Sequence, residues 1–273
     1  TIMVAYLKQE GRDEKSLAQA TAKADRILSE VEKMAQGNIA YNYDDLWTLK
    51  REGKRAIMLG IENGYAIGKD ISNVEKFRRR GVVYMTLCHN GDNDICDSAR
   101  GNSEHHGVSQ FGEQVIKEMN RVGMMVDLSH ASEDSFYDAI QISQVPIVCS
   151  HSSARILCDH PRNLTDDQMR ALAKSGGVAQ VTFYHGFLKK DGEATIIDAV
   201  NHLNHMVDVM GISHVGIGSD FDGDGGVRGL ASAAEMINFT RRLMRKRYNE
   251  EDLRLIWGEN FLRVMNITQN SVH

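Results

Sequence analysis

The stretch MMVDLSHASEDSFYDAIQISQVPIVCSHSSA, residues 124–154, decides the fold. It contains two continuous apolar runs, and a histidine follows each of them, His130 and His151. Continuous apolar strands, as opposed to alternating ones, are buried on both faces, as in a parallel sheet covered by helices. The stretch therefore predicts parallel strands whose carboxyl ends carry polar side chains.

The same unit recurs along the chain: a helix, a glycine at its C-terminal end, an apolar strand and a polar strand end. Strands are predicted at about 1–6, 56–61, 82–87, 124–128, 146–150, 177–183 and 214–219. Helices are predicted at 16–36, about 44–52, 73–80, 110–122, from Thr165 to Gly176, and 195–210. The helix after Thr165 has the capping-box pattern Thr165 to Gln168.

These seven strands favour an α/β fold of the (β/α)8 TIM-barrel type that lacks its first strand in this chain, because a closed barrel has eight. The alternative is an open, doubly wound sheet, which needs no eighth strand. No linker rich in Pro or Ser divides the sequence, so we predict one domain, residues 1–273. The chain begins inside an apolar run at Thr1, and we expect it to be truncated at the N-terminus.

Five strand ends carry side chains suited to metal chemistry. They are Glu62 in GIENG, His89 in TLCHN, His130 in VDLSHAS, His151 in IVCSHSSA and Asp220 in GIGSDFDG. In a parallel barrel all strands point the same way, so these side chains are expected to converge on one face. Carboxylate and imidazole ligands are typical of Zn²⁺ or a similar divalent ion in a hydrolytic site.

Composition restricts the partners of the protein. Of its 273 residues 42% are apolar, and the net charge is −5. The slight acidity argues against nucleic acid as a partner. The basic run from Arg241 to Arg247 is interrupted by apolar residues, which indicates a solvated helix face. No stretch is apolar for the 18 or so residues that a membrane span needs. We expect a soluble protein, with a weak preference for the cytoplasm.

One motif points elsewhere. The segment from Asp220 to Gly225 matches the opening of an EF-hand loop. The twelfth position of that loop requires a bidentate Glu, and here it is Ala231. The better interpretation makes Asp220 a catalytic carboxylate at a strand end.

The motifs GIENG, YMTLCHN, VDLSHAS, SHSSAR, RNLTDD, GIGSDFDG and GENFLRV together resemble the membrane (renal) dipeptidase family, peptidase family M19, an amidohydrolase-like group of metallopeptidases. The resemblance runs from about residue 55 to 266 in the order of the family and implies a (β/α)8 barrel with two zinc ions. Glu62 would bridge the ions, and His130 and His151 would bind the second one.

The resemblance also implies roles in substrate handling. His89 would face the substrate and stabilise the oxyanion, and Asp220 would act on the attacking water or the amino group. Arg162 would hold the substrate carboxylate, and Tyr184 is a further candidate for substrate binding. From the residues alone, Arg162 has an alternative role, which is to neutralise Asp166 and Asp167 at the start of the next helix.

The family has a His-x-Asp motif on its first strand that supplies further ligands, and nothing in this sequence matches it. We expect that motif within about 100 residues upstream of Thr1. The resemblance thus implies a zinc-dependent dipeptidase that uses a metal-bound hydroxide on dipeptides with a free C-terminal carboxylate. For partners, we expect a small dipeptide substrate and allow for a homodimer. The alternatives are another metal-dependent amidohydrolase, acting on a cyclic amide or lactam, and a non-catalytic peptide-binding barrel.

Overall fold

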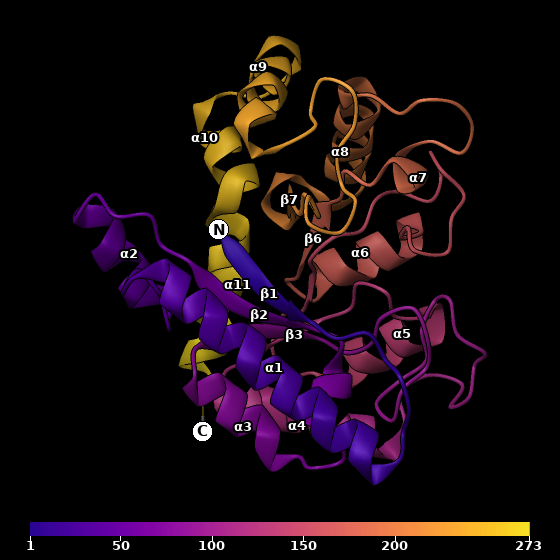
Figure 1. The fold of residues 1–273 in the computed structure, drawn as a ribbon. Helices are drawn as coiled ribbons and strands as arrows, with labels where there is room; N and C mark the ends of the chain where they lie inside the picture. The colour runs from indigo at the N-terminus through magenta and orange to yellow at the C-terminus, as the bar shows by residue number, and fades with distance from the viewer. Residues whose placement is uncertain (273) are drawn as a thin grey trace. The chain divides into compact units, whose positions relative to one another are not determined.

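A computed structural model of the chain describes residues 1–272 and divides them into two compact units. The first unit comprises residues 1–145 together with the chain from Met265 on, and the second comprises residues 146–264. Figure 1 shows the order of their helices and strands.

The first unit alternates strands and helices. Its elements up to residue 145 are β1 Ile2–Tyr6, α1 Glu14–Ala35, α2 Tyr43–Arg51, β2 Met58–Glu62, the 3-10 helix η1 Gly64–Ile67, α3 Ser72–Arg79, β3 Val82–Thr86, α4 Gln110–Val122, β4 Met125–Asp127 and α5 Glu133–Ile142. In Figure 1, α1 runs alongside the strands β1 to β3.

The four strands of this unit are parallel and follow chain order, β1-β2-β3-β4. Their last residues form one row across the sheet, because Tyr6 pairs with Glu62, Glu62 with Thr86, and Thr86 with Asp127. Neighbouring strands lie about 4.8 Å apart, so side chains at and just after this row are within reach of one another.

The second unit continues the alternation. It contains β5 Val148–Cys149, α6 Asp166–Lys174, β6 Val178–Val181, α7 His185–Leu188, α8 Ile196–Met210, η2 Ile212–His214, β7 Val215–Ile217, η3 Ala233–Glu235, α9 Met236–Lys246, α10 Glu250–Arg254, the π-helical turn η4 Leu255–Glu259 and the start of α11 Asn260–Asn270. Its strands β5, β6 and β7 are also parallel and in chain order.

The chain order of the strands decides between the two predicted architectures. A doubly wound sheet places successive strands on both sides of the first, so its order reverses. Within each unit the order follows the sequence without reversal, as in a (β/α)8 barrel. The predicted fold class is confirmed, with seven strands among the described residues. The prediction of a single domain remains a prediction.

Local signals in the sequence explain most of the helix ends. The Thr165 capping box forms, with the hydroxyl of Thr165 accepting from Gln168 N and the Gln168 side chain accepting from Thr165 N. Helix α4 ends at Gly123, which has φ +75 and adopts the left-handed conformation that glycine allows at a helix end. Helices α5, α7, α10 and α11 were not predicted from the sequence.

Most strands are buried, as the continuous apolar runs require, but β1 is an exception, with Met3 39% and Tyr6 40% exposed. Every residue of β3 is buried, and Leu59 and Ile61 of β2 are fully so. Helix α9 has the predicted solvated face, on which Arg241, Arg242 and Arg245 are exposed. No helix within residues 1–272 combines the length and the hydropathy that a bilayer crossing demands.

Candidate metal centre

Glu62 is the last residue of β2, and its side chain is 14% exposed. It occupies the centre of the row of strand ends, between Tyr6 and Thr86. The residue after it, Asn63, fixes the turn out of the strand at φ +89. The Asn63 side chain donates to Leu7 O at 3.0 Å and accepts from Tyr65 N at 3.1 Å. The carboxylate of Glu62 is therefore held on a strand end whose following turn is hydrogen-bonded on both sides.

His130 lies three residues beyond β4 with its backbone at φ +74. Such a left-handed conformation is uncommon for a residue with a Cβ, and it aims the side chain back over the strand ends. The ring is buried, with Nε2 3.1 Å from Glu62 Oε1 and Nδ1 3.2 Å from Asn90 Oδ1. Both nitrogens of this imidazole thus face an oxygen.

His89 lies beside this pair. Its Nε2 is 3.9 Å from Glu62 Oε1, which is too long for a hydrogen bond, and its ring centroid is 4.3 Å from that of His130. Tyr6 also packs against the His89 ring in an edge-to-face arrangement, with a centroid distance of 4.8 Å. Burial, and next the negative charge of Glu62, raise the pKa of the Tyr6 hydroxyl, so it stays a neutral donor at physiological pH.

A structured loop, residues 88–109, holds the backbone of both histidines. Within it, the Ser98 hydroxyl donates to the carbonyl oxygen of His89 and also contacts that of His130 at 3.3 Å. The amide of Ala99 donates to His130 O at 2.7 Å. The buried carboxylate of Asp92 fixes this loop by accepting from Ser98 N at 2.7 Å.

A second buried carboxylate, Asp127, supports the strand end before His130. It accepts from the Thr86 hydroxyl at 2.6 Å and from Ser129 N at 3.0 Å. Both contacts satisfy its charge within the protein, as a fully buried carboxylate requires. Asp127 therefore stabilises the turn that carries His130.

The donor set of the first unit fits a divalent cation. If Nδ1 of His130 carries its proton towards the oxygen of Asn90, the lone pair of Nε2 faces a carboxylate oxygen at 3.1 Å. Two lone-pair donors at this distance repel unless a proton or a cation lies between them. One imidazole nitrogen and one carboxylate oxygen are ligands that zinc takes.

In the second unit, His151 follows β5 and is 9% exposed. Its Nδ1 is 2.8 Å from the Ser150 hydroxyl, which fixes the orientation of the ring. Arg162 is also buried, and its Nη2 donates to His151 O at 3.4 Å, while its guanidinium lies over the ring of Phe187 at 5.3 Å. The structure therefore brings His151 and Arg162 together.

The acidic residues at the start of α6, which are the partners in the alternative role of Arg162, also have other partners. Asp167 pairs with Arg170 at 2.8 Å, and Asp166 pairs with His205 at 2.7 Å. These contacts, together with the capping box, already satisfy the N-terminus of α6.

Tyr184 and Asp220 lie in the loops that follow β6 and β7. The two loops are joined because Tyr184 forms a bridge with Gly225, whose amide donates to Asp220 O at 2.7 Å. Asp220 has φ +57, so its backbone needs the support of this turn. Gly218 permits the close approach of β7 to the end of β5, since a Cβ there would lie 1.7 Å from Ser150 O.

The structure places Glu62 at the end of its strand, and His89, His130, His151 and Asp220 two or three residues after theirs. In the first unit Glu62, His89 and His130 cluster, and in the second unit His151 contacts Arg162. Asn90 and Ser98 were not predicted. Asn90 directly follows His89, so its place in the sequence could have indicated that it lies near the site. The contact of Ser98 depends on the fold of its loop and could not be predicted in this way.

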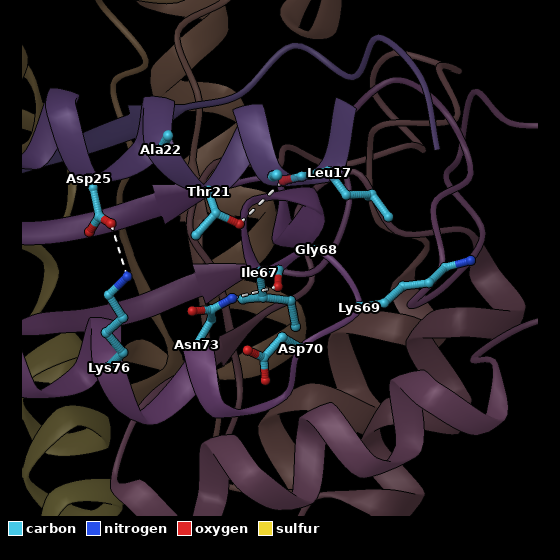
Figure 2. A pocket seen from close by; sticks show the side chains of 11 residues that line it. Leu17, Thr21, Ala22, Asp25, Ile67, Gly68, Lys69, Asp70, Asn73 and Lys76 are labelled. Atoms are coloured by element: carbon cyan, nitrogen blue, oxygen red, sulfur yellow. Dashed lines mark hydrogen bonds and ion pairs between the residues drawn. The ribbon is translucent and has the colours of Figure 1, made fainter. Parts of the chain in front are cut away.

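A separate surface cleft of about 400 Å³ lies between α1, η1 and α3 (Figure 2). Several of its polar groups already have partners, with Asn73 Nδ2 donating to Ile67 O at 3.0 Å and Lys76 Nζ lying 3.1 Å from Asp25 Oδ2. None of the strand-end residues lines this cleft. It offers no chemistry comparable to that of Glu62 and its neighbours.

Comparison with known proteins gives one consistent result. The family described as membrane dipeptidase (peptidase family M19) matches residues 1–273. An uncharacterized dipeptidase of Schizosaccharomyces pombe is 39% identical over 233 residues, which cover 83% of this chain and 56% of that protein. The dipeptidase tcpJ of Claviceps purpurea is 37% identical over 230 residues, covering 83% and 54%.

Solved structures agree with these relatives. The probable dipeptidase PvdM of Pseudomonas aeruginosa superimposes with a TM-score of 0.90 at 27% identity, over 95% of this chain and 82% of that one. A metallo peptidase of Rhodobacter sphaeroides, liganded with a phosphinate mimic of L-Ala-D-Ala, has the same fold, with a TM-score of 0.87 at 23% identity over 98% and 86%. The chain spans about half the length of the curated relatives it matches.

Proposed function

This chain belongs to the membrane dipeptidase family, peptidase family M19, and we propose that it is the part of a metal-dependent dipeptidase that carries most of the active site. The observation that carries the proposal is the buried pair of Glu62 and His130, in which a carboxylate oxygen and an imidazole nitrogen face each other at 3.1 Å. A binding module for peptides has no need of such a pair, because burying two ligand atoms against each other is unfavourable without a cation or proton between them.

We propose Glu62, His130 and His151 as metal ligands and zinc as the metal. Each of them carries a ligand atom of a kind that zinc takes, a carboxylate oxygen in Glu62 and an imidazole nitrogen in each histidine. When bound, a divalent ion supplies Lewis-acid chemistry, which makes water a nucleophile at neutral pH and polarises a carbonyl group. Two ions in the intact protein are expected from the family resemblance.

The remaining residues would handle the substrate. His89, whose ring contacts those of Tyr6 and His130, would donate a hydrogen bond to the oxyanion that forms on the scissile carbonyl. Asp220 would accept a proton from the attacking water and return it to the leaving amine.

Substrate length would be set by the second unit. Arg162 is a planar fork suited to a free carboxylate, and its stacking on Phe187 orients it. Tyr184 packs against the same ring at 4.6 Å and would line the binding site beside it. A clamp on the C-terminal carboxylate selects short substrates with a free C-terminus.

Metal analysis of the purified protein tests the proposal. Glu62→Gln and His130→Ala should lower the zinc content, whereas His185→Ala, which changes an exposed histidine, should not. A panel of free dipeptides, C-terminally amidated dipeptides and a cyclic amide should show hydrolysis of the free dipeptides. Full zinc content in His130→Ala, or preference for the cyclic amide, would contradict this function.

A further inference from the structure

The hydrogen bonds around His130 determine the orientation of its ring as well as its position. Its carbonyl oxygen accepts a hydrogen bond from Ala99 N at 2.7 Å and its backbone has φ +74, so the position of the Cα–Cβ bond that carries the ring is fixed. One face of the ring packs against His89. These contacts do not fix which ring nitrogen points at Glu62 or which one carries the proton.

The amide oxygen of Asn90 fixes both properties of the ring. It lies 3.2 Å from Nδ1 of His130, while Nε2 lies 3.1 Å from Glu62 Oε1. An amide oxygen only accepts hydrogen bonds, so its contact with Nδ1 requires a proton on that nitrogen. The Glu62 oxygen is also an acceptor, so when a cation instead of a second proton lies between it and Nε2, Nε2 is the nitrogen whose lone pair binds the cation.

We propose that Asn90 is a positioning residue that holds His130 in the tautomer protonated on Nδ1, so that Nε2 is the atom that binds the metal. The proposal rests on the proposed function, because it assigns the ligand atom of that site. Partners of this kind in metal sites typically change metal affinity by tenfold to hundredfold when removed.

The loop around Asn90 holds it in a fixed position relative to His130. Asn90 is the neighbour of His89, whose carbonyl oxygen is held by Ser98, and the same hydroxyl contacts the carbonyl of His130. One loop therefore fixes the backbone of both residues that share the hydrogen bond. Substitution of Asn90 leaves these backbone contacts in place, which separates its effect from that of unfolding.

Two variants test the assignment in the full chain. Asn90→Asp keeps an acceptor oxygen, and should retain zinc affinity within about threefold. Asn90→Leu has a similar size but no acceptor, and should weaken zinc binding by tenfold to hundredfold. Exposed Asn102 in the same loop provides matched controls, Asn102→Asp and Asn102→Leu, which should both bind zinc as the wild type does.

Zinc affinity would be measured by competition with a chromophoric chelator, and the protonated ring nitrogen of His130 by nitrogen NMR of ¹⁵N-histidine-labelled protein loaded with zinc. The wild type should show His130 protonated on Nδ1, and Asn90→Leu should lose this preference. Equal zinc affinity in wild type and Asn90→Leu, or protonation on Nε2 in the wild type, would overturn the proposal. A wild type that shows the Nδ1 tautomer but hydrolyses no dipeptide would instead refute the proposed function.

Discussion

His202 makes the stability of the second unit dependent on pH. It is 1% exposed in helix α8, where Nδ1 accepts from Ala154 N at 3.0 Å and Nε2 is 3.0 Å from Leu188 O. Burial lowers the pKa of His202 from 6.5 to about 4. The neutral ring thereby joins the loop after His151 to helix α7.

The direction of the effect follows from proton binding. Between pH 6.5 and about 4 the unfolded chain binds a proton at His202 and the folded chain does not, so the folded state loses stability as the pH falls. The full contribution is present above pH 6.5. Its loss down to pH 4 amounts to about 3 kcal/mol, at ~1.4 kcal/mol for each pH unit.

Urea unfolding at several pH values would measure this contribution. At pH 7, His202→Gln should be less stable than the wild type by about 1–3 kcal/mol, because the Ala154 amide loses its acceptor. The difference should shrink as the pH falls from 6.5 to 4, since Gln does not titrate. The control His185→Gln, an exposed position, should follow the wild type at every pH. Parallel curves for wild type and His202→Gln would refute the reasoning.

Three further changes test the site and its support. Asp220→Asn should keep its zinc and lose ~100-fold or more in turnover of dipeptides, and loss of zinc instead would make Asp220 a ligand. Arg162→Ala should lower kcat/KM for free dipeptides by about tenfold to hundredfold, which corresponds to a loss of ~1.5–3 kcal/mol in transition-state stabilisation. It should have little effect on amidated dipeptides. An unchanged ratio of kcat/KM between the two kinds of substrate would show that Arg162 does not bind the carboxylate. Gly218→Ala places a Cβ 1.7 Å from Ser150 O and should cost about 3 kcal/mol or more in unfolding free energy, whereas Gly258→Ala, with no atom near its Cβ, should cost much less.

The sequence determined which residues stand at the strand ends. Apolar runs bounded by glycines define the strands, and the residue that follows each run is fixed by counting, so Glu62, His89 and His130 could be assigned to one edge without coordinates. The parallel order of the strands follows from the same pattern, because continuous apolar strands must be covered on both faces. The structure confirms this order within each unit.

The tertiary structure decided how those residues are oriented. The choice between the two ring nitrogens of His130 depends on Asn90 and on a loop whose folding is governed by Asp92 and Ser98. The burial of Arg162 against Phe187 depends on contacts between segments 25 residues apart in the chain. Periodicity reports only which face of an element a residue occupies, whereas side-chain direction and hydrogen-bond partners are set by packing between segments distant in sequence. For that reason the sequence alone could identify candidate metal-binding side chains but not which of their atoms face one another.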